Sequence, residues 1–175
     1  KNGFRGRIRM INMFVSYCQR DSVYADNIDL HFKGKNITIH RDIREISAWK
    51  SIREYMNSIR DMDYAILIIT DNYLKSFNCM YEVLELIKDN NYESKIFPVV
   101  VENGIYSAIG RIPYIKYWEH KFEELKNHIS QINFINTGNL IDDLKRKIEL
   151  MDKCMKMCSF IGGLHYFIKE EKKEI

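Results

Sequence analysis

Several features that would place a protein in a specialised class are missing from this sequence. No apolar run approaches the roughly 18 residues that cross a bilayer, so no membrane segment is expected. The basic start KNGFRGRIRM (1–10) lacks the long apolar region of a secretory signal peptide. Only two prolines occur, with no repeat and no low-complexity linker, and the 175 residues therefore indicate one domain.

Cysteine is scarce and irregularly spaced. Cys18, Cys79, Cys154 and Cys158 form no disulfide framework, and we expect reduced thiols in a cytoplasmic protein. Cys154 and Cys158 would share one helix face, but only the remote His165 follows them as a further ligand. Apolar packing is therefore expected there, and no metal site.

The sequence also lacks a large excess of positive or negative charge. The net charge is +3, and no concentrated basic patch accompanies it, so nucleic acid is not an expected partner. The basic cluster at 145–147 alternates with acidic residues, which is typical of a solvated helix face. Hydrophobic residues make up 46% of the chain, which indicates a folded globular domain.

Four apolar runs have the length and composition of strands. They are IRMINMFVSY (8–17), NITIH (36–40), YAILIIT (64–70) and IFPVVVE (96–102), and PYIKYW (113–118) is a weaker fifth. The third and fourth are continuous and rich in β-branched residues, which is typical of strands buried on both faces of a parallel sheet.

The segments between these runs have helical periodicity. Helices are expected over 21–35 (closing at Gly34), 47–63, 76–91 (capped by Ser76) and 138–163. Strands that alternate with helices form right-handed βαβ units. The sequence therefore predicts an α/β fold: a flavodoxin-like three-layer sandwich with a five-stranded parallel sheet and helices on both faces.

Polar residues follow three expected strands at the points where the strands end, over 16–19, 40–42 and 70–71. In open parallel sheets, ligands bind outside the carboxyl ends of the strands. An aromatic ring, a fixed cation, carboxylates and hydroxyls at one edge could receive a planar base, sugar hydroxyls and phosphates. Polar residues also begin ordinary loops, and on pattern alone both interpretations stay open.

Four ordered segments resemble the conserved boxes of Toll/interleukin-1 receptor (TIR) domains, over about residues 10–120. FVSYCQRD (14–21) resembles the first box, and ITIHRDIREISAWKSI (37–52) is similar to the second strand and its loop. DYAILIITDNYLKSFNCMYEVLEL (63–86) is similar to the third strand, a Tyr-Leu-x-Ser segment and a Cys-x-x-Glu at the head of a helix. KIFPVVVE (95–102) is similar to the fourth strand.

The resemblance, of bacterial type, implies a TIR domain over 10–158, an N-terminal flank over 1–9 and a C-terminal tail or helix extension over 159–175. Many bacterial and plant members cleave NAD+ between nicotinamide and ribose, or cyclise the ADP-ribose product. Their essential residue is a glutamate in the helix after the third strand, a position matched here by Glu82. Animal receptor and adaptor members mostly use the fold for assembly without catalysis.

A glutamate suits this reaction physically. Cleavage builds oxocarbenium-like charge on the ribose, and a nearby carboxylate can stabilise that charge. The competing interpretation is a solvated glutamate near the positive end of a helix. The apolar stripe of Met80, Leu84 and Ile87 places Glu82 on the flank or outer side of its helix.

Other candidates each carry two interpretations. Tyr17 could line the nicotinamide pocket or pack in the core, and Trp49 could lie near the substrate or in the core. Arg41 could bind the diphosphate or form a surface pair with Asp42 or Glu45. Cys79 matches a cysteine of many members and is expected to pack rather than react. Members often have tryptophan four residues before the glutamate, where this chain has Asn78, a departure that argues for weaker turnover.

The expected protein is thus an NAD+ hydrolase or ADP-ribose cyclase of bacterial antiphage defence, cytoplasmic and self-associating with other TIR domains. NAD+ is expected as substrate, with no cofactor and no metal. The alternative is a non-catalytic interaction module. A phospho-acceptor receiver domain is excluded because Ser-Tyr-Cys-Gln after the first strand supplies no acidic pair. With Glu82 catalytic, the expected substrate-binding residues are Ser16, Tyr17, Cys18, Arg41, Asp42, Ser47, Trp49, Asn78 and Cys79.

Overall fold

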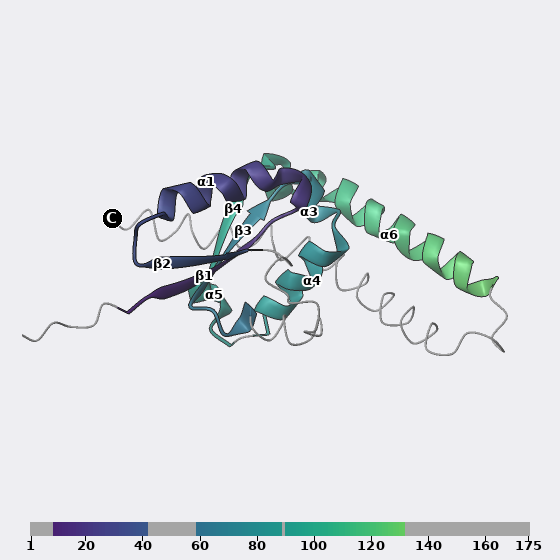
Figure 1. The fold of residues 1–175 in the computed structure, drawn as a ribbon. Helices are drawn as coiled ribbons and strands as arrows, with labels where there is room; N and C mark the ends of the chain where they lie inside the picture. Colours follow the sequence, from purple (N-terminus) through teal and green to yellow (C-terminus); the bar gives the residue numbers. More distant parts are fainter. Residues whose placement is uncertain (1–8, 42–58, 89, 132–175) are drawn as a thin grey trace, which may run out of the picture.

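Four parallel strands form the centre of the molecule (Figure 1). The computed structural model describes residues 9–41, 59–88 and 90–131. Within these residues the strand order is β2-β1-β3-β4, with β1 at Ile11–Ser16, β2 at Ile37–Arg41, β3 at Tyr64–Ile69 and β4 at Ile96–Val100. The four main strands expected from the sequence are confirmed.

β1 and β3 lie side by side, and their residues 13–16 and 65–69 are buried, with apolar clusters on both faces of the sheet. The pairing aligns Phe14 with Ala65 and Ser16 with Leu67. Because the strands are parallel, their carboxyl ends meet at one edge, where the chain leaves β1 for Tyr17 and leaves β3 for Thr70. This pairing brings together polar residues that lie far apart in the sequence.

One face of the sheet is covered by α1 (Ser22–Phe32), which follows the short turn η1 (Gln19–Asp21). Ala25 of α1 is buried in one core cluster with Val15 of β1 and Ile68 of β3. After α1 the chain turns into β2 through Gly34, whose φ of +79° is a conformation that side chains rarely adopt. The helix ends at Phe32, two residues before the expected Gly34.

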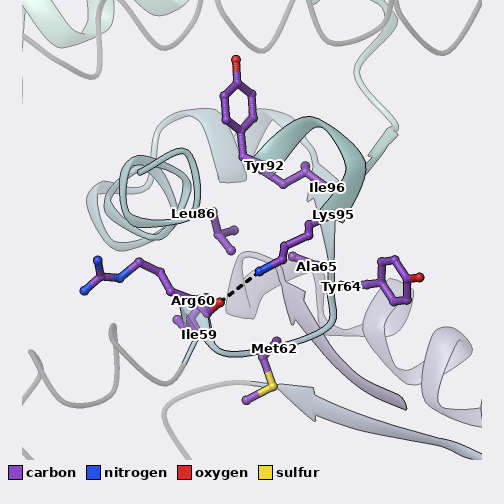
Figure 2. A pocket seen from close by; sticks show the side chains of 9 residues that line it. All are labelled: Ile59, Arg60, Met62, Tyr64, Ala65, Leu86, Tyr92, Lys95 and Ile96. Atoms are coloured by element: carbon purple, nitrogen blue, oxygen red, sulfur yellow. Dashed lines mark hydrogen bonds between the residues drawn. The ribbon is translucent and has the colours of Figure 1, made fainter. Parts of the chain in front are cut away.

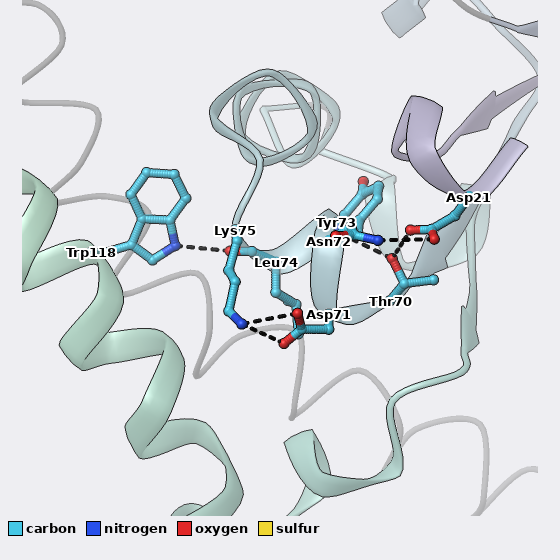
Figure 3. Close-up of polar contacts among 8 residues, drawn as sticks. All are labelled: Asp21, Thr70, Asp71, Asn72, Tyr73, Leu74, Lys75 and Trp118. Atoms are coloured by element: carbon cyan, nitrogen blue, oxygen red, sulfur yellow. Dashed lines mark hydrogen bonds and ion pairs between the residues drawn. The ribbon is translucent and has the colours of Figure 1, made fainter.

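The other face carries α3 (Asp71–Leu74), α4 (Phe77–Leu86) and part of α6 (Ala108–Ser130). Trp118 of α6 is 2% exposed, and its indole N–H donates to the Leu74 carbonyl over 2.9 Å (Figure 3). Helices on both faces of a parallel sheet give the predicted three-layer α/β fold. The short elements α5 (Tyr92–Lys95) and η3 (Asn103–Tyr106) flank β4.

The fifth strand expected at 113–118 is wrong, because these residues lie inside α6. Ser107 caps the helix by accepting a hydrogen bond from the Gly110 amide over 2.9 Å. Tyr114 and Trp118, four residues apart, are both buried, whereas Ile112 is exposed. Residues four apart lie on the same side of a helix, so Tyr114 and Trp118 can be buried together there. This helical pattern determines the structure of the segment, although its short aromatic run suggested a strand.

Some expectations lie wholly or mostly outside the described residues. They are the helices over 47–63 and 138–163, the candidates Asp42, Ser47 and Trp49, and Cys154 with Cys158. The boundaries of the flank and tail likewise stay predictions. Among the helices that the structure describes, none has the length and apolarity of a membrane span.

Candidate functional site

Glu82 lies in the second turn of α4, beside the last residue of β1, and is 8% exposed. The hydroxyl of Ser16, which ends β1, donates a hydrogen bond to Glu82 Oε2 over 2.5 Å. That length is normal for a hydroxyl bonded to an ionised carboxylate. The end of the strand therefore restricts the orientation of the carboxylate.

The burial of Glu82 corrects its expected place on the flank or outer side of the helix. The buried residues of α4 are Cys79, Met80, Glu82, Val83 and Leu86, whereas Leu84 and Ile87 of the predicted stripe are only partly buried. A carboxylate can be buried there because Ser16 supplies a polar partner from the strand end. Helical periodicity could not anticipate this partner, since it comes from a distant segment.

Tyr73 extends this contact into a network of three buried side chains. Its hydroxyl lies 2.8 Å from Ser16 Oγ, and the tyrosine is completely buried. Burial raises the pKa of Tyr73 well above its ordinary value, and Cys79 and Glu82 raise it further, against a smaller lowering by Ser16. The sequence pattern included Tyr73 in the Tyr-Leu-x-Ser segment but assigned it no role.

Asp21 ties the loop after β1 to the turn after β3 (Figure 3). Its Oδ2 accepts from the Thr70 hydroxyl over 2.6 Å, and its Oδ1 accepts from the Asn72 side-chain amide over 3.0 Å. Thr70 Oγ1 in turn accepts from the Tyr73 backbone N–H over 3.0 Å and caps α3. These contacts fix the turn that carries Tyr73.

Cys79 faces the loop after β1. It is 4% exposed, and its Sγ lies 3.6 Å from the Tyr17 carbonyl oxygen as a donor. Burial raises the pKa of the Cys79 thiol far above its ordinary value, with smaller contributions from Ser76, which lowers it, and from Glu82 and Cys18, which raise it. A thiol that holds its proton so firmly is a poor nucleophile, and this agrees with a packing role.

Tyr17 and Arg41 lie together on the α1 side of the sheet. Tyr17 is 7% exposed, and the guanidinium carbon of Arg41 lies 5.5 Å from its ring centroid. Arg41 pairs with Asp26 and, over 2.6 Å, with Asp29, both on α1. The carboxylates of α1 were not among the partners expected for Arg41.

The structure thus brings Ser16, Cys18, Cys79 and Glu82 together at the carboxyl end of β1 on the α4 side of the sheet, whereas Tyr17 packs on the α1 side. Asn78 lies one helical turn before Glu82 and is exposed. The contact of any of these residues with a substrate stays a prediction.

A small pocket opens at the opposite edge of the sheet (Figure 2). It lies beside Tyr64 and Ala65 at the start of β3 and Ile96 at the start of β4, where Lys95 Nζ donates to the Arg60 carbonyl over 3.5 Å. The centre of a water molecule could occupy only ≈ 10 Å³ of this pocket, so a nucleotide does not fit in it. Neither Ser16 nor Glu82 lines it, so this pocket is not the predicted site.

These features define an α/β domain with a buried carboxylate at the carboxyl ends of adjacent parallel strands. The family model described as TIR domain matches residues 13–132. The chain therefore belongs to the TIR domain family.

The chain is also similar to a curated protein and to a solved structure. A Toll-like receptor 4 from Pinctada imbricata is 28% identical over 123 residues, which cover 59% of this chain and 13% of that protein. The chain thus spans a small part of the relative's length. Among solved structures, the TIR domains of the activated Roq1 resistosome directly recognizing the pathogen effector XopQ match with a TM-score of 0.54 and 18% identity, over 91% of this chain and 98% of that chain. At that identity the match supports the fold alone.

Proposed function

We propose that this TIR domain cleaves NAD+ at the bond between nicotinamide and ribose, with Glu82 as the catalytic residue. The observation that carries the proposal is the buried Glu82 carboxylate, which Ser16 holds at the carboxyl end of β1. Family membership adds support, because Glu82 occupies the position of the essential glutamate in the NAD+-cleaving members that the sequence resembles.

The proposed chemistry needs one well-placed carboxylate. The bond between ribose C1′ and the nicotinamide nitrogen breaks, and its electron pair leaves with nicotinamide, which becomes neutral. Positive charge develops on the ribose, and the Glu82 carboxylate stabilises it. Water then attacks C1′ and loses a proton, giving ADP-ribose; attack by another part of the same molecule gives a cyclic product instead.

Burial favours such a role for Glu82. Electrostatic stabilisation is stronger where water is excluded, and Glu82 is 8% exposed among apolar residues of α4. Under this proposal Tyr17 lies near the nicotinamide, and Arg41 would have to exchange a carboxylate of α1 for the diphosphate. Asp42, Ser47 and Trp49 would complete the substrate site.

The biological setting that we propose is bacterial defence against phage, in the cytoplasm, where loss of NAD+ or a nucleotide product signals infection. We also propose self-association with other TIR domains, in which a neighbouring subunit's loop completes the site. Family resemblance alone supports this setting. Phage challenge of cells that express the wild type or Glu82→Ala would test it, with protection expected only from the wild type.

NAD+ incubation with product analysis tests the proposed activity. Wild type and Glu82→Ala are incubated with NAD+ in dilute, concentrated and crowded solution, and nicotinamide, ADP-ribose and cyclic product are separated chromatographically. Nicotinamide is expected from the wild type and not from Glu82→Ala. Glu119→Gln, which changes an exposed carboxylate of α6, is the matched control and should retain activity. No nicotinamide in any condition, or equal release by Glu82→Ala, would contradict the proposal.

A non-catalytic assembly module is the second candidate, and Asn78 is the observation that favours it. The residue is exposed one turn before Glu82, where NAD+-cleaving members often place tryptophan. Concentration-dependent association of the wild type without release of nicotinamide would favour the module over the enzyme.

A further inference from the structure

We infer that Tyr73 is a positioning residue, which orients the Glu82 carboxylate through the hydroxyl of Ser16. The inference rests on the proposed function in so far as orientation of Glu82 affects turnover. The network itself does not depend on that function.

The three side chains come from three separate elements. Ser16 ends β1, Tyr73 belongs to α3 and Glu82 to α4. Their polar atoms form a continuous chain, with 2.8 Å from Tyr73 Oη to Ser16 Oγ and 2.5 Å from Ser16 Oγ to Glu82 Oε2. All three residues are buried, so water does not compete freely for these contacts.

The direction of the hydrogen bonds follows from the number of protons. Ser16 has a single hydroxyl proton, which it donates to the carboxylate. The proton between Tyr73 and Ser16 must then come from the tyrosine. Burial keeps the pKa of Tyr73 well above its ordinary value, so the phenol retains this proton at neutral pH. Tyr73 therefore donates to Ser16, and Ser16 donates to Glu82.

The backbone holds Tyr73 in this place. Its N–H donates to Thr70 Oγ1 over 3.0 Å, and the Thr70 hydroxyl donates to Asp21 over 2.6 Å (Figure 3). A tyrosine with its amide bonded and its ring fully buried has little freedom to move. It can therefore restrain the rotation of the Ser16 hydroxyl.

The consequence for the proposed reaction concerns orientation rather than binding. Without the tyrosine, the Ser16 hydroxyl can turn away, and the carboxylate loses its fixed direction toward the ribose. Loss of one such hydrogen bond, worth about 1 kcal/mol, corresponds to a fall of about fivefold in kcat. KM should change by less than about twofold, because Tyr73 is buried and does not touch the substrate in this account.

The kinetic test compares four variants with the wild type: Tyr73→Phe, Ser16→Ala, their double mutant and Tyr114→Phe. Tyr114 is a buried tyrosine of the same core cluster on α6, so Tyr114→Phe controls for loss of a buried hydroxyl. Tyr73→Phe and Ser16→Ala should both lower kcat, and the double mutant should be no slower than Ser16→Ala. Tyr114→Phe should retain the wild-type kcat.

An infrared measurement tests the network without turnover. The carboxylate stretching band of Glu82 is isolated as the difference between wild type and Glu82→Gln. The band should shift in Tyr73→Phe and in Ser16→Ala, with no further shift in the double mutant and none in Tyr114→Phe. If Tyr73→Phe does not fold, Thr70→Val is measured instead, because it removes the acceptor that holds the Tyr73 amide. The Glu82 band should then shift in Thr70→Val, and an unshifted band would overturn the inference.

The two readouts separate failure of the inference from failure of the proposed function. Shifted bands in a protein that releases no nicotinamide would sustain the network and reject the enzyme. Normal turnover by Tyr73→Phe with an unshifted band would overturn the inference while the enzyme stands. Additive losses of kcat in the double mutant would also overturn it, because Tyr73 would then act by a route other than Ser16.

Discussion

The Asp21 side chain joins two segments of the candidate site, the loop after β1 and the turn after β3. Its two carboxylate oxygens accept hydrogen bonds from Thr70 and Asn72, which lie on the turn after β3. Asp21→Ala removes both acceptors and leaves partly buried donors without them. We expect the free energy of unfolding to fall by about 1–3 kcal/mol, measured by urea denaturation.

Asp61→Ala is the matched control for this prediction. Asp61 is exposed, so its replacement should change the free energy of unfolding by less than about 0.5 kcal/mol. A loss of similar size in both variants would show that Asp21 has no special structural role.

Tyr73 also gives the folded state a dependence on alkaline pH. Its pKa is raised in the folded protein, so above the ordinary tyrosine pKa of about 10 the unfolded chain releases a proton that the folded chain keeps. The stability contributed by Tyr73 is thus present below about pH 10 and lost as pH rises further. Tyr73→Phe should flatten the fall in urea midpoint between about pH 9 and 11.

Cys79 also has a raised pKa, but it is present in both wild type and Tyr73→Phe. The difference between the two proteins therefore gives the contribution of Tyr73 to the pH dependence of stability. Tyr24→Phe, at an exposed tyrosine of α1, should retain the wild-type slope. If the slopes of Tyr73→Phe and wild type coincide, the Tyr73 phenol does not stay protonated through burial as described.

At the scale of elements, α4 carries both the catalytic candidate and its main departure from the family. Asn78 and Glu82 lie one turn apart, and Asn78 is exposed. Asn78→Trp would place an aromatic ring one helical turn before Glu82, beside the proposed ribose position. An aromatic contact worth about 0.5–1.5 kcal/mol predicts a rise of about 2- to 10-fold in kcat/KM for NAD+.

Ile109→Trp serves as the control, because it adds a tryptophan at an exposed position of α6. Its kcat/KM should equal that of the wild type. An unchanged or lower kcat/KM in Asn78→Trp would show that position 78 does not face the substrate in this chain.

The elements that could be read from the sequence are those whose pattern is local. β3 is a continuous apolar run, and α4 begins at Phe77, directly after Ser76, whose hydroxyl accepts from the Cys79 amide over 3.4 Å. The segment 113–118 misled because a short run rich in aromatic and apolar residues also suits a strand. The helical spacing of Tyr114 and Trp118 becomes clear only within the full length of α6.

The candidate site was predictable only where it depends on local sequence patterns. The parallel-sheet rule and the family pattern together placed Ser16, Cys79 and Glu82 near one edge. The partners that orient Glu82 could not be derived, because the Ser16 bond joins residues 66 apart in sequence and the Tyr73 bond joins residues 57 apart. The pairing of Arg41 with carboxylates of α1 depends in the same way on how β2 packs beside that helix.

At the scale of the whole molecule, the proposal makes activity depend on assembly. If a neighbouring subunit completes the site, nicotinamide release per mole of protein should rise with protein concentration and parallel the fraction of oligomer. Light scattering coupled to size-exclusion chromatography gives that fraction. Constant specific activity in a monomeric sample would show that one chain is sufficient.

In the proposed reaction the negative charge of Glu82 stabilises the positive charge on the ribose, and Glu82→Gln removes that charge. Glutamine keeps the size of the side chain and an oxygen that can accept from Ser16, and it removes only the charge. The decisive measurement is the initial rate of nicotinamide release from NAD+ by concentrated wild type and Glu82→Gln. We predict a fall of about 100-fold or more in Glu82→Gln; equal rates in the two proteins, or no release by the wild type, would contradict the account.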